Sequence, residues 1–406
     1  MLLNLVLSVL STLIRVIVNV GIVAIYSHSL DIQTFSYFVL GLFIAQITCV
    51  FIDSGINVEI LRFSRLEDDK ISYARLASST SVRLTIGVSV VIVSFIIGVF
   101  IGELNQALVL SSSLLSGIFS SIIETYLISI KTKNKFKLEV VVVVMQAILL
   151  FLLSMISFLG EGFVLISILL PRIITLSWLM FRVGNFLEYR KSINLSTIYS
   201  YFSRLKYYSI DSIFSNLNIL LDNSIIILVL GREIYGTYQP ISRLYNSALA
   251  MVGAVSSFII PLASTFNSNR KKWLILKMIF TIFGLLACIG MLIFSEYIIS
   301  HFFGVGFIKE STTIRFLAAI LFVRYMAAGS GSFLTLIGRQ RIRAIINVVL
   351  TVTAFIVGYI YTESINHVLF VILISQTLLL VFYTIFGLVY SKRETITLVN
   401  KKMDCL

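Results

Sequence analysis

Twelve long apolar runs constrain this chain of 406 residues more than any other feature of its sequence. Each is about as long as the roughly 20 residues that a helix needs to cross the hydrocarbon core of a bilayer. Backbone groups in lipid must be satisfied within the segment, and the runs are about twice as long as a barrel strand, so we expect α-helices. The runs lie near residues 5–26, 34–57, 78–101, 107–130, 138–159, 163–181, 207–230, 236–262, 274–295, 311–337, 344–361 and 367–390.

The composition agrees with a chain that crosses a membrane many times. Hydrophobic residues make up 58% and charged residues 13% of the sequence, and the mean hydropathy is +1.01. Soluble domains carry about 25% charged residues. The first apolar run lacks a small-residue cleavage site, so it predicts a retained spanning helix and not a signal peptide. We therefore predict an all-α integral membrane protein with about twelve transmembrane helices and no soluble domain.

Cysteine and histidine are too few and too scattered for a metal site or a disulfide framework. Cys49 and Cys288 lie inside apolar runs, Cys405 lies in the tail, and the three histidines are far apart in sequence. The chain has no G-x-x-x-x-G-K-[ST] loop for ATP. No Ser/His/Asp, Cys/His or carboxylate pair presents itself for catalysis. The sequence predicts no metal, no organic cofactor and no enzyme.

The formal charge of +13 follows mainly from the loops on one side of the predicted bundle. Alternate connections, with the C-terminal tail, carry 23 lysines and arginines, whereas the opposite connections carry only Arg232 and Lys309. Basic residues accumulate in cytoplasmic loops, so both termini are predicted to be cytoplasmic. This asymmetry also explains short basic stretches such as "KTKNKFK" (131–137), and we expect no nucleic-acid partner.

Basic residues also fall inside the predicted spans. Arg83 and Lys277 lie near cytoplasmic ends, where we expect the side chains to snorkel to the interface. Deeper positions hold Arg15, Arg172, Arg243 and Arg324, each costing about 3 kcal/mol at the bilayer centre on insertion scales. The sequence offers Asp222 as the one deep carboxylate against these four. We therefore expect the four arginines to face a watery cavity that attracts an anion; the alternative is that each is packed between helices and hydrogen-bonded.

A weak internal repeat divides the chain into two halves of six spans each. Near the start of the second span of each half, "QTFSYFVL" (33–40) and "EIYGTYQP" (233–240) align at an offset of 200 residues. The boundary falls at about residue 206, within a basic connection. An even number of helices per half makes the repeats parallel, so we predict a lobe of six helices at 1–206 and a second at 207–406.

Three stretches resemble one family of transporters. "FIDSGINVEILRFSR" (51–65) resembles the end of the second helix in polysaccharide flippases, with its D-x-G and following arginine. "LDNSIIILVLGREIYGTYQPISRLYNSALAMVGAVSSFIIP" (221–261) resembles their seventh and eighth helices, and "FFGVGFIKESTTIRFLAAILF" (302–322) resembles their outer loop and tenth helix. The chain is similar over its whole length to O-antigen (Wzx-type) flippases of the multidrug/oligosaccharidyl-lipid/polysaccharide (MOP) exporter superfamily.

The resemblance implies a MATE-like fold and translocation of an undecaprenyl-pyrophosphate-linked oligosaccharide, an O-antigen or capsule repeat unit, across the bacterial inner membrane. A guanidinium can donate two parallel hydrogen bonds to the oxygens of one phosphate. We therefore expect the pyrophosphate to be bound by Arg15, Arg172, Arg243 and Arg324. Asp222 binds a coupling proton or sodium ion, or neutralises one arginine, and we favour the second role. The side chains that we expect to contact the sugar are Asn19, Tyr126, Asn218, Tyr245 and Asn246.

Other functions stay open at this point. A multidrug antiporter of the same superfamily shares the fold, but pumps that export cations are expected to have acidic cavities. A polytopic polysaccharide polymerase or ligase acts on similar lipid-linked sugars, but resembles chains with a long outer loop, and the longest here is about fifteen residues. A membrane scaffold has no use for deep arginines. The expected partners are the lipid-linked oligosaccharide, membrane lipids and other membrane proteins of polysaccharide assembly.

Overall fold

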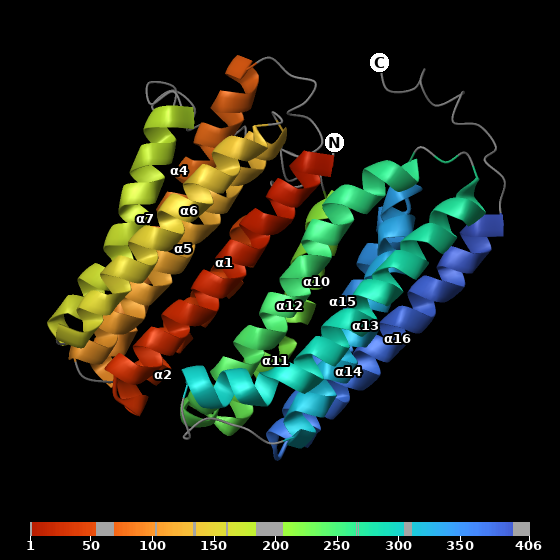
Figure 1. Ribbon diagram of the computed structural model, residues 1–406. Helices are drawn as coiled ribbons and strands as arrows, with labels where there is room; N and C mark the ends of the chain where they lie inside the picture. Colours follow the sequence, from red (N-terminus) through yellow and green to blue (C-terminus); the bar gives the residue numbers. More distant parts are fainter. Residues whose placement is uncertain are drawn as a thin grey trace. The chain divides into compact units, whose positions relative to one another are not determined.

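The computed structural model describes residues 2–53, 69–101, 104–132, 135–159, 161–183, 206–264, 266, 268–303 and 311–392. All regular structure in these ranges is helical (Figure 1). The helices before the middle of the chain are α1 (Leu2–Ser29), α2 (Ile32–Asp53), α4 (Asp69–Ile101), α5 (Leu104–Thr132), α6 (Phe136–Ser154) with a 3-10 turn η1 (Met155–Leu159), and α7 (Glu161–Val183). The later helices are α10 (Lys206–Ile219), α11 (Leu221–Ile225), the π-helix η2 (Ile226–Leu230), α12 (Arg232–Ser264), α13 (Asn269–Phe302), α14 (Ser311–Leu336), α15 (Gln340–Tyr361) and α16 (Ile365–Lys392).

Each predicted apolar run coincides with a helical segment, so the all-α membrane fold is confirmed. Ten of the described helices are long and apolar enough to cross a membrane. The pair of segments Ser209–Ile219 and Leu221–Leu230 makes an eleventh span if it is counted as one helix, bent by 63°. The predicted run at 236–262 corresponds to α12, which has 33 residues. The cytoplasmic location of the termini stays a prediction.

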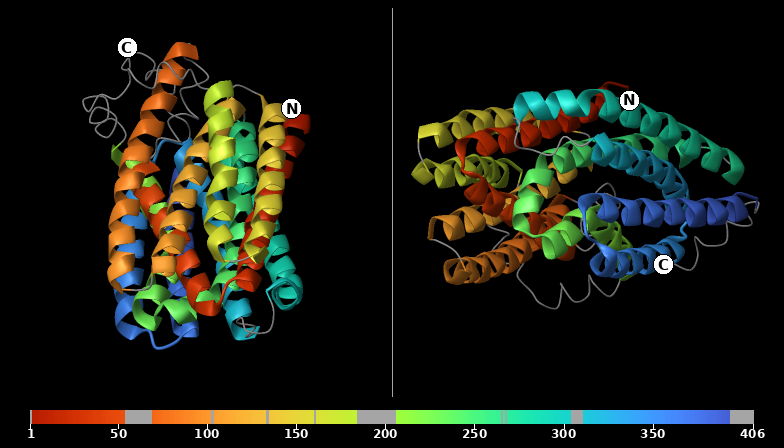
Figure 2. Two further views of the ribbon diagram at one scale, coloured as in Figure 1. Left: turned by 90° about the vertical axis from the view of Figure 1, so that its left-hand side faces the viewer. Right: turned by 90° about the horizontal axis from the view of Figure 1, so that it is seen from below.

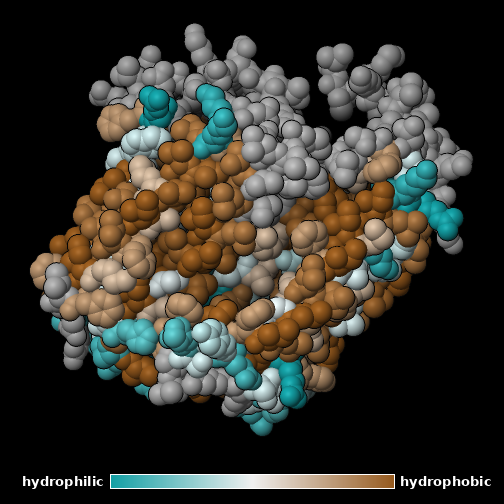
Figure 3. Space-filling view, in the orientation of Figure 1, coloured by the Kyte–Doolittle hydropathy of each residue, from teal (hydrophilic) through white to brown (hydrophobic). Residues whose placement is uncertain are grey.

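The outer faces of the helices are apolar, as expected for contact with lipid chains. Helix α13, for example, exposes Leu274, Met278, Ile282 and Leu286 at intervals of four residues, so that they form a stripe along one face. Figure 3 shows apolar side chains covering the middle of α6 and of α13, with hydrophilic side chains toward the helix ends. Soluble proteins rarely expose an apolar surface of this extent, whereas the lipid-facing surface of a membrane protein is apolar.

The chain separates into two compact units. Figure 2 shows α4, α5 and α7 of the first unit running alongside one another. Unit 1 comprises Met1–Arg243 and Ile298–Ile308, and unit 2 comprises Leu244–Tyr297 and Lys309–Leu406. Helices α12 and α13 therefore contribute residues to both. The lobes predicted at 1–206 and 207–406 stay a prediction, since much of the connection on which their boundary rests (184–205) lies outside the described residues. Most of the quoted stretch 51–65 and residues 304–310 also lie outside them.

Helix α5 forms the centre of unit 1, and small residues hold it against α2. A Cβ atom on Gly117 of α5 would lie 2.4 Å from the Cβ of Ala45, and one on Gly41 of α2 would lie 2.4 Å from the carbonyl oxygen of Leu110. Glycine permits this close approach because it has no side chain. Buried aliphatic side chains of α5, among them Leu114, complete the core around it. Helices α2 and α5 therefore form a closely packed pair in unit 1.

The two sequence-repeat segments meet each other within unit 1. A Cβ atom on Gly236 of α12 would lie 3.4 Å from the Cβ of Ser36 in α2, and these residues occupy equivalent positions of the repeat. Around them, the rings of Phe43 and Tyr235 have centroids 5.6 Å apart. The guanidinium of Arg232 lies 4.4 Å from the centre of the Tyr37 ring. The beginnings of α2 and α12 are therefore in direct contact.

Candidate functional site

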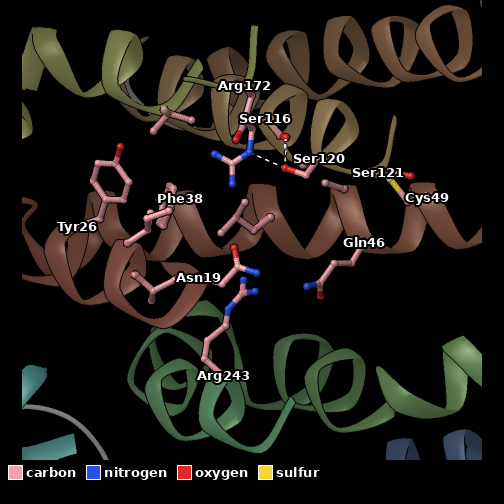
Figure 4. A pocket seen from close by; sticks show the side chains of 16 residues that line it. Asn19, Tyr26, Phe38, Gln46, Cys49, Ser116, Ser120, Ser121, Arg172 and Arg243 are labelled. Atoms are coloured by element: carbon pink, nitrogen blue, oxygen red, sulfur yellow. Dashed lines mark hydrogen bonds between the residues drawn. The ribbon is translucent and has the colours of Figure 1, made fainter. Parts of the chain in front are cut away.

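Unit 1 contains a cavity of about 230 Å³ that carries two arginines. Helices α1, α2, α5, α7 and α12 supply its walls, and Figure 4 shows Arg172 and Arg243 on opposite walls. The remaining polar lining is uncharged, and none of the lining residues is acidic. The cavity is lined by Asn19, Ile22, Val23, Tyr26, Phe38, Leu42, Ala45, Gln46, Cys49, Ser116, Gly117, Ser120, Ser121, Ile168, Arg172 and Arg243.

Arg172 extends from α7 toward α5, where its Nε donates a hydrogen bond to the Ser120 hydroxyl. It is buried, with 8% of the residue exposed. The neighbouring part of the wall is fixed by a hydrogen bond of 2.7 Å between the hydroxyls of Tyr26 and Ser167. A guanidinium has five N–H donors, and the bond to Ser120 uses one. The others remain for groups in the cavity.

Arg243 approaches the same cavity from α12, and Figure 4 shows its guanidinium beside the Asn19 side chain. No hydrogen bond or ion pair joins Arg243 to another group within the described ranges, and its Nε is buried without a partner. Its charge lies close enough to that of Arg172 for the two to interact unfavourably. Two like charges on a cavity with a neutral lining create a site that favours an anion.

A smaller cavity of about 90 Å³ adjoins the first and shares Asn19, Ser120 and Arg172 with it. Arg15 and Glu124 face each other on its wall and form an ion pair. The second Nη of Arg15 lies 3.6 Å from a carboxylate oxygen of Glu139, which is fully buried. Arg15 is therefore balanced by two carboxylates, whereas Arg172 and Arg243 are not balanced by any described acid on their cavity.

Two expectations about buried charge were wrong. Asp222 is not the only carboxylate available to the deep arginines, because Glu124 and Glu139 lie beside Arg15. Arg83 does not snorkel: only 2% of its side chain is exposed, and it pairs with Asp53 at the end of α2. Helix α4 begins at Asp69, well before the predicted start at residue 78, and one face of it packs on α5. Arg83 therefore points into the protein, where it also donates to the Ser121 carbonyl at 3.1 Å and to the Thr125 hydroxyl.

Arg324 belongs to unit 2, where α14 carries it. The residue is 7% exposed, and its guanidinium lies 5.6 Å from the centre of the Tyr245 ring, within range of a cation–π interaction. The adjacent Tyr325 hydroxyl donates a hydrogen bond of 2.7 Å to the Ala248 carbonyl on α12. Asn246, the neighbour of Tyr245 on α12, is partly buried. Arg324, Tyr245 and Asn246 thus lie in one neighbourhood of unit 2.

Asp222 lies at the break between α10 and α11, inside unit 1. The residue is 3% exposed, and its carboxylate accepts a hydrogen bond of 2.8 Å from the Tyr238 hydroxyl. The next residue, Asn223, accepts hydrogen bonds from Gln239 at 3.2 Å and Ser242 at 3.1 Å. These contacts attach the broken helix to α12, the helix that carries Arg243. Asn218, also predicted to contact sugar, is buried on α10.

Of the predicted sugar contacts, Asn19 lines both cavities, whereas Tyr126 is fully buried in the hydrophobic core around α5. Sequence reasoning missed Ser116, Ser120 and Glu124 as lining residues. A signal for them exists, because these three residues recur at every fourth position of α5. That spacing places polar groups on one face of a helix.

Comparison with known proteins identifies the fold. No family model and no curated protein sequence matches the chain. Among solved structures, the outward-facing and inward-facing conformations of a multidrug resistance MATE family transporter of the MOP superfamily align with TM-scores of 0.68 and 0.67, both at 15% identity. These alignments cover 96% of this chain and 95% of the other in the first case, and 94% of each in the second. A MOP superfamily transporter from Pyrococcus furiosus, described as having reversed polarity of its binding pocket, aligns with a TM-score of 0.66 at 15% identity, covering 96% and 95%. The MATE-like part of the predicted fold is therefore confirmed.

Proposed function

We propose that this chain is a flippase that moves an undecaprenyl-pyrophosphate-linked oligosaccharide, an O-antigen or capsule repeat unit, from the cytoplasmic to the periplasmic leaflet of a bacterial inner membrane. The observation that carries the proposal is the pair Arg172 and Arg243 on one cavity whose lining contains no acid. This charge pattern suits a substrate with an anionic head group. The MATE-like fold supports transport as the class of function.

The position of the two guanidiniums inside the predicted membrane spans supports this proposal. Isolated positive charge within a bilayer is costly, and such residues mark substrate or ion pathways by default. A pyrophosphate brings at least two negative charges, which compensate both guanidiniums at once and use their paired donors. Serine hydroxyls and the amides of Asn19 and Gln46 on the same wall supply neutral hydrogen-bonding groups for phosphate or sugar oxygens.

The other predicted residues take different roles in this proposal. Arg15 holds the wall of the smaller cavity through its carboxylate partners, and it is a secondary contact for the head group. Arg324, Tyr245 and Asn246 offer a contact for the sugar in unit 2, as does Asn218 in unit 1. Asp222 anchors the broken helix through Tyr238, and a coupling ion at Asp222 is a weaker alternative.

The mechanism that we propose is alternating access without covalent chemistry, so the chain is not an enzyme. The lipid tails stay in the bilayer while the head group passes through the protein. Both termini face the cytoplasm in this scheme, as the basic loops predict. Its partners are the lipid-linked oligosaccharide and membrane lipids, together with other membrane proteins of polysaccharide assembly.

A multidrug antiporter is the second candidate, because the aligned MATE structures are described as those of a multidrug resistance transporter. The cationic cavity distinguishes the two candidates. A pump for organic cations is disfavoured by Arg172 and Arg243, whereas a pump for small organic anions is compatible with them. Transport of a small anion through the purified protein in vesicles, without any flipping of a lipid-linked sugar, would support this candidate.

The test of the flippase follows the lipid-linked repeat unit in cells that lack this gene. We expect the unit to accumulate in the cytoplasmic leaflet and to return to the outer leaflet when the gene is restored. Arg172→Gln and Arg243→Gln should not restore it, whereas the matched control Arg270→Gln, at an exposed position of α13, should. Accumulation of single units in the periplasmic leaflet would refute flipping and indicate polymerisation or ligation.

A further inference from the structure

Glu124 is the one acidic residue among the described residues that line the two adjoining cavities. It lies one helical turn after Ser120 on α5, which is one of the three residues that both cavities share. Its side chain is 42% exposed, so water in the smaller cavity reaches the carboxylate. An ionised Glu124 opposes an anion held by Arg172, because it places negative charge on the same continuous polar wall.

Arg15 does not depend on Glu124 alone for charge compensation. Glu139 lies 3.6 Å from Arg15 and is itself fixed by a hydrogen bond of 2.5 Å from the Ser11 hydroxyl. Removing one partner of an isolated buried ion pair leaves an uncompensated charge, which is strongly unfavourable. Here, neutralisation of Glu124 leaves Arg15 with the Glu139 carboxylate. A proton therefore binds Glu124 without leaving a guanidinium uncompensated.

The charged side chains around Glu124 determine how protonation of Glu124 changes the net charge of the two cavities. Glu124 and Glu139 both face Arg15, so a proton on Glu124 removes one negative charge from the smaller cavity and leaves Arg172 without an ionised carboxylate among the lining residues of that cavity. Arg243 adds a further positive charge on the larger cavity. Adjacent helices also carry Lys137 near the start of α6 and Arg182 near the end of α7, both at exposed positions, and Arg83 of α4, which is paired with Asp53.

We infer that Glu124 is a proton-binding site linked to the anion site at Arg172 and Arg243. A proton from water adds to one carboxylate oxygen of Glu124 to form a neutral carboxylic acid, and no bond of the substrate changes. Anion binding and proton binding favour each other by reciprocal linkage. The proton reduces the net negative charge that enters the protein with the substrate. This inference rests on the proposed anionic substrate and adds a coupling ion and its position.

The test uses the full-length protein in lipid nanodiscs and sulfate as the probe, because sulfate does not itself titrate near neutral pH. Calorimetry in buffers of different ionisation enthalpy measures the protons taken up per sulfate bound. We expect up to one proton per sulfate, and an affinity that rises by up to about tenfold for each unit fall in pH. Glu124→Gln should bind sulfate at alkaline pH as tightly as the wild type does at acidic pH, with no proton uptake.

Two further variants separate this role from a structural one. Glu124→Asp keeps a carboxylate and should retain proton uptake, and Glu233→Gln, a matched change at an exposed position of α12, should behave as the wild type. Sulfate binding without proton uptake in the wild type, or unchanged uptake in Glu124→Gln, would overturn the inference.

An infrared measurement distinguishes failure of the inference from failure of the proposed function. On acidification without sulfate, the wild type should gain a carboxylic-acid carbonyl band that Glu124→Gln lacks. If that band is present but sulfate binds at no pH, the anionic site and its linkage are both refuted, while Glu124 is still a proton site. If the band is absent and sulfate binds, Glu124 is not a proton-binding site, while the proposed anion-binding site at Arg172 and Arg243 is still supported.

Discussion

The buried ion pair between Arg83 and Asp53 offers a sharp test of how unit 1 is held together. Asp53→Asn keeps the size and shape of the side chain but removes its charge. Only 2% of the Arg83 side chain is exposed, so its charge has almost no access to water. Breaking a buried pair by removing one partner costs about 3–5 kcal/mol. The Asp53 side chain is 24% exposed, and Arg83 keeps its bonds to Ser121 and Thr125, so we expect the lower limit, about 3 kcal/mol.

The free energy of unfolding, measured by titration with denaturing detergent in mixed micelles, checks this value. Asp31→Asn is the matched control, because the Asp31 carboxylate caps the start of α2 by accepting hydrogen bonds from the backbone N–H groups of Gln33 and Thr34, and Asn replaces Asp well at a helix N-cap. The double variant Asp53→Asn/Arg83→Met should recover most of the loss, since a neutral side chain of similar length no longer needs a counter-charge. A loss in Asp53→Asn equal to that of the control, or a double variant less stable than the single one, would refute the reasoning.

Three further predictions concern helix contacts and one cap. The pair Ser36→Cys/Gly236→Cys should form a disulfide, since their Cβ atoms would be 3.4 Å apart, and oxidation should stop transport reversibly if this contact opens during the cycle. Gly117→Val should destabilise the protein by about 2 kcal/mol or prevent folding, because a Cβ there already lies 2.4 Å from Ala45; a melting curve equal to the wild type would contradict the close contact. Burial raises the pKa of Asp31, but hydrogen bonds from Thr34 and Gln33 outweigh that effect and hold it below its usual value. The part of the stabilisation that depends on ionisation is therefore complete above the unfolded-state pKa and lost as pH falls through the lower folded-state pKa, so Asp31→Ala should cost about 1 kcal/mol at neutral pH and less in strong acid.

Apolar run length predicted the helices well because lipid leaves the backbone few choices. A run of about 20 apolar residues must form a helix, whichever neighbours it acquires. The break in the seventh span was not predicted, since "NLNILLDN" (216–223) contains neither proline nor glycine. The structure shows a 63° bend there, fixed by contacts of Asp222 and Asn223 with α12.

The pairing of charges was less predictable than the helices, because it depends on helix rotation and on which helices are neighbours. Arg15 and Glu124 are 109 positions apart in sequence. Glu139 lies in the first turn of α6, where the sequence alone favours an exposed side chain, yet it is fully buried. Of the cavity lining, only the polar face of α5 could be recognised in the sequence, because Ser116, Ser120 and Glu124 recur at every fourth position.

Four arginines point into the interior of unit 1, and they fall into two groups whose difference makes a last prediction. Arg15 and Arg83 have carboxylate partners, so replacing either by glutamine should destabilise the protein. Arg172 and Arg243 face each other across a cavity without an acid, and each raises the cost of the other. Arg243→Gln should therefore leave the free energy of unfolding unchanged or increase it by up to about 1 kcal/mol, while anion binding is lost, as expected where function opposes stability. If Arg243→Gln instead destabilises the protein as much as we expect Arg83→Gln to do, Arg243 is a structural residue. The proposal that the cavity is the anion-binding site would then be refuted.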